Sequence, residues 1–258
     1  MTNTSIIGNW QNSYNSILSI TQQDENGLFQ GTYSSSTGST GVYKVVGFAP
    51  PSSSVNYPVS LSIFWKSMTG GEPDPTWHWV SMMCGEMILG EDPRIEVLHS
   101  MIANGPYPAV DIYGPGLYSE TLVFTPSDSS LGSTGTPPNG NMDISGRWSS
   151  QEDCFGYHTL NIKSSDVAAF GTFEGSGKSI EIAGLFDADA EALTLATTSF
   201  SGIYIDDNKN ESGITLGGFI SVDRTEMELT IFKSIGTSEA AKYASTQILK
   251  TLKFAKDA

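Results

Sequence analysis

Short runs of β-branched and aromatic residues recur along the chain every 8–14 residues, separated by clusters of Gly, Pro, Asn, Asp and Ser. Leu28–Tyr33, Val59–Trp65 and Arg94–Met101 are typical, and Asn26-Gly27 suits the positive φ angles of a tight hairpin turn. Thr237–Lys250 is the one helical candidate, and its second part is assigned to a strand below. The pattern predicts an all-β fold, an antiparallel sandwich or an up-and-down barrel.

One segment differs from the rest in composition. Thr125–Asp143 consists almost wholly of Ser, Thr, Gly, Pro, Asn and Asp, and lacks the apolar residues that a core element would bury. It predicts a linker, with a first domain at 1–124 and a second at 144–258.

The two halves repeat one another. Gly8–Trp10 and Gly31–Tyr33 of the first half are echoed in the same order by Gly146–Trp148 and Gly171–Phe173 of the second. The sequence therefore predicts a tandem duplication.

Charge narrows the set of partners. The chain has 13 Lys and Arg against 28 Asp and Glu, a net charge of −15, and its densest basic cluster is only Lys250, Lys253 and Lys256. Such a surface repels nucleic acid and anionic lipid, and no apolar run approaches the roughly 20 residues that a membrane span needs. We expect neither nucleic-acid binding nor membrane association.

Cysteine and the N-terminus say little about the compartment. Cys84 and Cys154 are too few for a disulfide scaffold or a zinc site, and the three histidines lack metal-binding spacing, so we expect free thiols, no metal and no cofactor. Residues 1–7 have no basic or long apolar region, so no signal peptide is expected. Cytoplasmic and processed secreted locations both stay open.

Several motifs occur in a recognisable order. The first half contains Trp10-x-Asn12-x-x-x-Ser16, then Gly31-Thr32-Tyr33-x-Ser35, then Trp65-Lys66; the second half ends with Gly236–Thr246. This order resembles that of the avidin/streptavidin family of biotin-binding barrels. The resemblance implies two antiparallel up-and-down eight-stranded barrels in tandem, with Gln247–Phe254 in the last strand.

Four polar residues form the core of the candidate site. Asn12 and Ser16 share parity on the first strand, as do Tyr33 and Ser35 on the second, so all four are expected inside an apolar barrel. Each polar group would cost about 1–3 kcal/mol if left unpaired, so the four must pair together, hold water or receive a ligand. The resemblance implies that Asn12, Ser16 and Tyr33 donate to a ureido carbonyl, Ser35 accepts from a ureido NH and Trp65 forms an aromatic wall. A satisfied polar core cluster is the alternative.

Other candidate ligand-binding residues depart from the family pattern: Trp79, Ser81, Met83, His99, Met101 and Tyr118. Ser81 keeps a hydroxyl, but Met83, His99 and Tyr118 stand where the resemblance places larger aromatic residues. Trp79 replaces a small residue and could block part of the pocket. We therefore expect biotin, or a related ureido or cyclic compound, to bind with weakened affinity.

The second half lacks this polar set. By count along the chain, Ser150 replaces the Asn, Cys154 the Ser, Phe173 the Tyr and Gly175 the next Ser, and Ser199 falls where Trp65 lies. It is expected to be a degenerate barrel without a ureido site.

The sequence thus predicts a non-enzymatic small-molecule binding protein, and the resemblance implies a homo-oligomer, a dimer of tandem chains. One alternative is a defence or lectin-like interaction protein that uses the barrels as a scaffold, with Trp77 and Trp79 stacking on sugars. Another is a weak hydrolase built on Ser81, His99 and Asp111, although no G-x-S-x-G motif is present.

Overall fold

A computed structural model describes most of the chain. The described residues are 5–35, 40–51, 53, 55–69, 79–105, 114–129, 135, 140–150, 156–175, 177–190, 195–208, 210–236 and 246–257. Within them there are sixteen strands and no helix, and none of them forms a helix that could cross a membrane.

The first eight strands close into one antiparallel barrel, in which each strand pairs with its neighbours in the sequence and β8 returns to β1. They are β1 (Gly8–Asn12), β2 (Ile17–Gln23), β3 (Leu28–Ser35), β4 (Gly41–Phe48), β5 (Tyr57–Phe64), β6 (Trp79–Ile88), β7 (Arg94–Ala103) and β8 (Gly116–Pro126).

The next eight strands close a second barrel in the same order. They are β9 (Gly146–Ser150), β10 (His158–Ser165), β11 (Ala168–Gly175), β12 (Lys178–Phe186), β13 (Ala196–Ile205), β14 (Glu211–Ile220), β15 (Glu226–Ile235) and β16 (Thr246–Lys256). The predicted fold class is confirmed, and Gln247–Phe254 lies in a strand. The division at 1–124 and 144–258 stays a prediction.

The duplication extends to packing details. Trp10 is buried and its indole Nε1 donates to the carbonyl of Ile6 at 2.8 Å; the buried Trp148 donates to the carbonyl of Ile144 at 3.0 Å. Each tryptophan thus ties its first strand to the residues that precede it, in the same way in both barrels.

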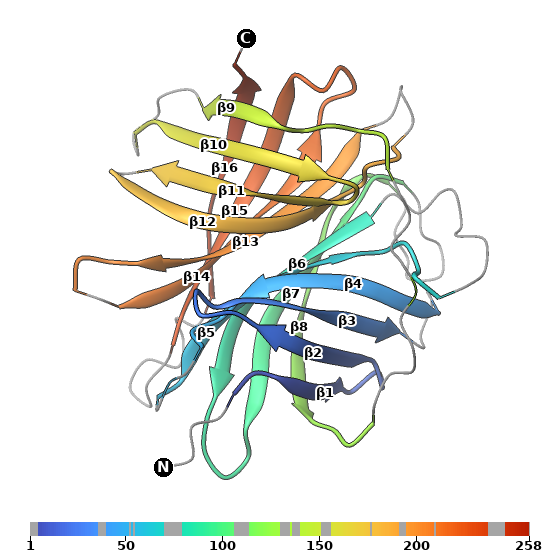
Figure 1. Cartoon of the computed structure of the whole chain (residues 1–258), viewed down its shortest axis with the longest axis vertical. Coiled ribbons are helices and arrows are strands. Elements are labelled where there is room, and N and C mark those ends of the chain that lie inside the picture. Colours follow the sequence, from blue (N-terminus) through green and yellow to red (C-terminus); the bar gives the residue numbers. More distant parts are fainter. Residues whose placement is uncertain are drawn as a thin grey trace.

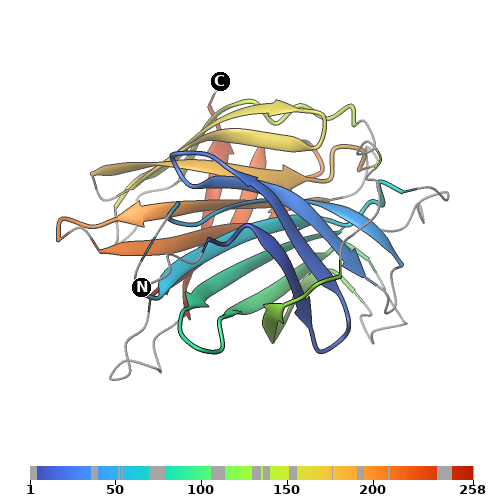
Figure 2. The same ribbon diagram turned by 60° about the horizontal axis from the view of Figure 1, so that its bottom comes forward.

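The two barrels lie side by side, with the N-terminus beside the first and the C-terminus beside the second (Figures 1 and 2). All eight residues of β5 are buried, because its outward face packs against the second barrel. The Ser60 hydroxyl donates to the carbonyl of Gly202 at 3.0 Å, and the hydroxyls of Ser62 and Ser199 lie 2.7 Å apart. Small polar groups therefore pair across the contact between β5 and β13.

Outward residues of β6 and β7 complete this interface. Met82, Cys84 and Ile102 form a buried cluster with Phe232 of the second barrel. A Cβ added at Gly217 would lie 2.6 Å from Ile102 Cδ1, so Gly217 lets these side chains pack closely against β14. Burial raises the pKa of the Cys84 thiol to about 11, which keeps the thiol protonated at neutral pH.

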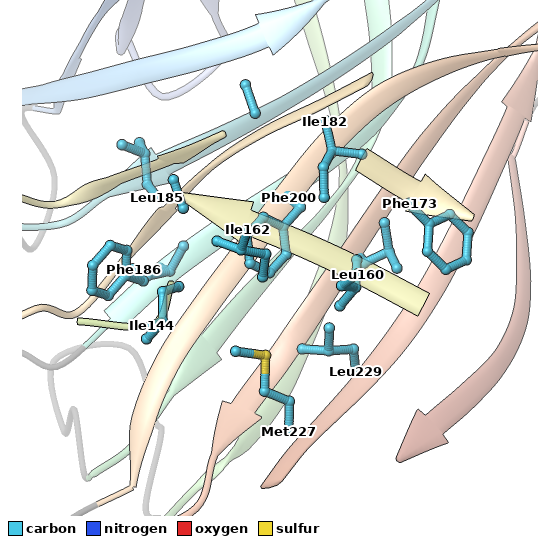
Figure 3. Packing of buried hydrophobic residues seen from close by; sticks show 14 of the residues in the cluster. Ile144, Leu160, Ile162, Phe173, Ile182, Leu185, Phe186, Phe200, Met227 and Leu229 are labelled. Carbon is cyan, nitrogen blue, oxygen red and sulfur yellow. The ribbon is translucent and has the colours of Figure 1, made fainter. Parts of the chain in front are cut away.

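The core of the second barrel runs along its whole length (Figure 3). Phe173 lies at one end of the cluster, and Phe186 and Ile144 lie at the other. Val46, Phe48 and other outward residues of the first barrel extend the same cluster. The hydrophobic core is thus continuous between the barrels.

Candidate functional site

The first polar group of the candidate site is held by the turn between β1 and β2. The side-chain oxygen of Asn12 accepts hydrogen bonds from the backbone N–H groups of Tyr14 and Ser16, both at 3.0 Å. Asn15 takes a φ of 62° in this turn, a conformation that Asn tolerates better than most residues. With its oxygen engaged, Asn12 directs its amide Nδ2 to the Tyr33 hydroxyl at 3.3 Å.

Asn12, Ser16 and Tyr33 therefore meet inside the first barrel. Their exposed fractions are 5%, 2% and 5%, and Ser35, on the same face of β3 as Tyr33, is also buried. Burial raises the pKa of Tyr33, an effect that hydrogen bonds from Ser16 and Asn12 partly offset. Tyr33 is thus a neutral hydroxyl at physiological pH and keeps a proton to donate.

Aromatic rings enclose this polar group. The ring of Trp65 lies 5.7 Å from that of Tyr33 in an edge-on arrangement and 4.9 Å from that of Tyr43. Phe124 adds a further edge-on contact to Tyr33 at 6.4 Å. Sequence reasoning missed Tyr43 and Phe124, although Tyr43 is the direct partner of Tyr33 in the pairing of β3 with β4.

A chain of hydrogen bonds runs from Trp65 to the surface. The Trp65 indole donates to the Ser81 hydroxyl at 2.7 Å, and that oxygen lies 2.8 Å from His99 Nε2. On its other side, His99 Nδ1 lies 3.3 Å from a carboxylate oxygen of Glu120. The Tyr14 hydroxyl donates to the second oxygen of Glu120 at 2.9 Å.

The Glu120 carboxylate orients this series of hydrogen bonds. An ionised carboxylate can only accept hydrogen bonds, so His99 Nδ1 donates to Glu120, while His99 Nε2 contacts the Ser81 hydroxyl. The hydrogen bond from His99 is the main cause that lowers the pKa of Glu120; burial opposes it, and a hydrogen bond from Tyr14 adds to the lowering. Sequence reasoning missed Glu120; its pairing opposite His99 in β7 and β8 is the signal that locates it.

The remaining candidates lie on the same inner surface. Trp79 is fully buried and Met83 is almost so, both in the core cluster that contains Tyr33 and Trp65. Met101 and Tyr118 are partly buried and pack against that cluster. The structure thus brings the predicted residues of the first barrel into one interior.

Two other predicted features have different outcomes. Asp111 and Trp77 lie outside the described residues. Trp79 faces inward with no exposed area, so its ring does not form an exposed platform for sugars. The described residues contain no group of three or more His, Cys, Asp or Glu that could hold a metal ion.

The pairing of strands corrects two correspondences for the second barrel. Leu160 faces Trp148 as Leu18 faces Trp10, which puts His158 in the place of Ser16. Cys154, expected there, lies outside the described residues. The expectation arose from counting along the chain, which ignores the longer connection that precedes β10.

The second correction concerns Trp65. Gly202 takes the position of Ile63, so Tyr204, two residues further on, corresponds to Trp65. The expectation that Ser199 occupies this position is wrong, because its hydroxyl faces the first barrel and contacts Ser62. Phe173 and Gly175 do occupy the positions of Tyr33 and Ser35.

The chain is similar to a known protein family over part of its length. Residues 1–83 match the Avidin family. A matching solved structure is the crystal structure of Xenavidin, at 17% sequence identity and a TM-score of 0.37, with 47% of this chain and 96% of that chain covered. No curated protein matches. The family match and the two closed eight-stranded barrels confirm the predicted resemblance to the avidin family, with two avidin-like barrels in tandem.

Proposed function

We propose that the first barrel is a non-enzymatic binding site for a small cyclic molecule with a urea-like carbonyl, biotin or a relative of it. The observation that carries the proposal is the convergence of Asn12, Ser16 and Tyr33 inside an apolar barrel beside Trp65. Asn12 and Ser16 hydrogen-bond to the Tyr33 hydroxyl in the structure, and together these three groups can donate to a single carbonyl oxygen. The Trp65 indole suits the apolar face of a ring.

The affinity for biotin is expected to fall below that of the family's strong binders. His99 hydrogen-bonds to both Ser81 and Glu120, so the inner surface is polar at a position where the resemblance places an aromatic residue. Met83 and the buried Trp79 also change the shape of the interior. Each lost hydrogen bond costs about 1–3 kcal/mol, and about 1.4 kcal/mol corresponds to a tenfold change in Kd.

Calorimetric titration with biotin and dethiobiotin tests the proposal. Tyr33→Phe removes one donor and keeps the ring, so we expect the Kd for biotin to rise about tenfold, in line with a loss of about 1.4 kcal/mol. Tyr204→Phe is the matched control, because Tyr204 corresponds to Trp65 in the other barrel, and it should leave the Kd unchanged. Absence of binding to both compounds, or equal affinity of Tyr33→Phe and the parent chain, would overturn the proposal.

We also propose that the chain forms a dimer of tandem chains. The face of β5 and β6 already contacts the second barrel within one chain, so a dimer would use another face. Light scattering should give twice the mass of 27.6 kDa; a mass of 27.6 kDa would contradict dimerisation.

The hydrogen bonds of Ser81, His99 and Glu120 favour a second candidate function, weak ester hydrolysis. Ser81 Oγ would attack the ester carbonyl and pass its proton to His99 Nε2, which would protonate the departing alcohol; water would then release the acid and regenerate the hydroxyl. The test is turnover of an activated ester such as p-nitrophenyl acetate. Hydrolysis must disappear in both Ser81→Ala and His99→Ala, and activity retained in either variant would exclude this mechanism.

A further inference from the structure

The inner surfaces of the two barrels carry opposite charge at corresponding positions. Glu120 faces His99 in the first barrel, whereas Lys250 faces Ile231 at the same place in the second. Met101 faces Ser81 in the first barrel, and the corresponding residue opposite Ile214 is Lys233. The second barrel has therefore replaced a carboxylate and a thioether with two ammonium groups.

Lys233 and Lys250 line a cavity at one end of the second barrel. The cavity has a volume of about 360 Å³, and its walls are mainly apolar. Phe173, Ile180, Ile214 and Ile231 form these walls, and this is the end at which Phe173 lies in Figure 3. Its size falls within the range of pockets that hold small organic molecules.

Two stacked aromatic rings line the cavity, and a neighbouring glycine leaves room for them. The ring of His158 stacks on that of Phe173, with 5.6 Å between centroids and 9° between planes. A Cβ on Gly175 would lie 2.4 Å from the His158 ring, so the glycine makes room for the stacked pair. The two rings thus present a flat aromatic wall.

Positive charge gathers at the same cavity. The ring of Tyr204 lies 5.3 Å from the ammonium of Lys178 and 5.1 Å from that of Lys233. Lys178 also pairs with Asp207 at 2.7 Å, whereas within the described part of the chain Lys233 has no ion pair. In a protein with a net charge of −15, this is an unusual local excess of cations.

A bulge positions Lys250. The pairing of β15 with β16 shifts between Ile231 and Phe232, so that Lys250 faces Ile231 while Ile248 faces Phe232. The intervening Leu249 joins the cavity lining. Bulges redirect side chains in this way beside binding sites.

We propose that this cavity binds a small molecule with a flat apolar body and one carboxylate. The rings and isoleucines take the body, and Lys233 and Lys250 receive the carboxylate by charge-assisted hydrogen bonds. In the first barrel Glu120 stands in place of Lys250, so a ligand carboxylate held at this position would meet a like charge there. The two barrels thus offer opposite charges to a ligand at corresponding positions.

Calorimetric titration with 2-naphthoate and with its neutral counterpart 2-naphthamide tests this assignment. The parent chain should bind naphthoate at least tenfold more tightly than naphthamide. Lys233→Met, which installs the residue found at the corresponding position of the first barrel, should weaken naphthoate at least tenfold and change naphthamide less than twofold. Lys250→Gln should act in the same direction.

Lys253→Gln is the matched control, since Lys253 lies on the same strand but its side chain is 78% exposed and pairs with Glu228. It should leave naphthoate binding unchanged. Tyr33→Phe should also leave it unchanged, which separates this site from the site proposed in the first barrel. No binding of naphthoate, equal affinity for the two probes, or an equal loss in Lys253→Gln would overturn the assignment.

Discussion

Glu120 connects a buried histidine with the surface of the first barrel. One carboxylate oxygen faces His99 and the other accepts from Tyr14, while about half of the side chain stays exposed. The hydrogen bond from His99 lowers the pKa of Glu120, so the folded state prefers the ionised form more than the unfolded chain does. A group with a lowered pKa stabilises the fold above its unfolded pKa and loses that contribution as pH falls through the folded value.

Urea unfolding of Glu120→Gln and the parent chain between pH 7 and pH 3 checks this linkage. The parent chain should be more stable at pH 6–7, and the difference should shrink below about pH 4.3, the ordinary pKa of Glu. Glu228→Gln, at an exposed pair with Lys253, should show a smaller difference at neutral pH. A difference between Glu120→Gln and the parent that stays constant over the whole range would contradict the linkage.

The alternation of hydrophobic and polar residues along a strand predicts which side chains face the core of its own barrel. It does not predict contacts with the other barrel. Val59–Trp65 was expected as a strand, and its odd-numbered residues do face the core. The same pattern would leave Ser60 and Ser62 in solvent, whereas both are buried, because a second barrel covers them. The contact joins residues far apart in the sequence, so the pattern along one strand does not predict it.

The candidate site, too, was predicted only in part from the sequence. Parity was enough to place Asn12 and Tyr33 inside the barrel. The expectation that Ser16 shares a strand with Asn12 is wrong, because β1 ends at Asn12 and Ser16 lies in the turn before β2, which brings it back to the same site. Glu120 and the place of Tyr204 depend on the pairing of strands whose connections differ in length, and counting residues along the chain does not reveal that pairing. Strand pairing, rather than residue type, was the missing information.

The contact between strands β5 and β13 gives a prediction for the free energy of unfolding. Ser62→Ala should lower the free energy of unfolding by about 1–3 kcal/mol, because the buried Ser199 hydroxyl loses its partner. Ser62→Ala combined with Ser199→Ala should cost less than the sum of the two single changes. Denaturant unfolding of all four proteins completes the cycle, and strict additivity would show that the two hydroxyls do not interact.

At the scale of the whole molecule, one continuous interface joins two barrels of the same topology. Hydrogen bonds, the cluster around Met82 and Cys84, and a shared hydrophobic core hold the pair together. The arrangement is that of a dimer, yet the partners have different inner surfaces: Glu120 in one and Lys250 in the other.

Covalent fusion has a consequence for how such a pair can evolve. In a symmetric homodimer every substitution is made twice, so both cavities must change together and any cost at the shared wall is doubled. Encoding both copies in one polypeptide removes that constraint. One compartment can then be rebuilt for a new guest while its twin retains the older chemistry and continues to support the common wall.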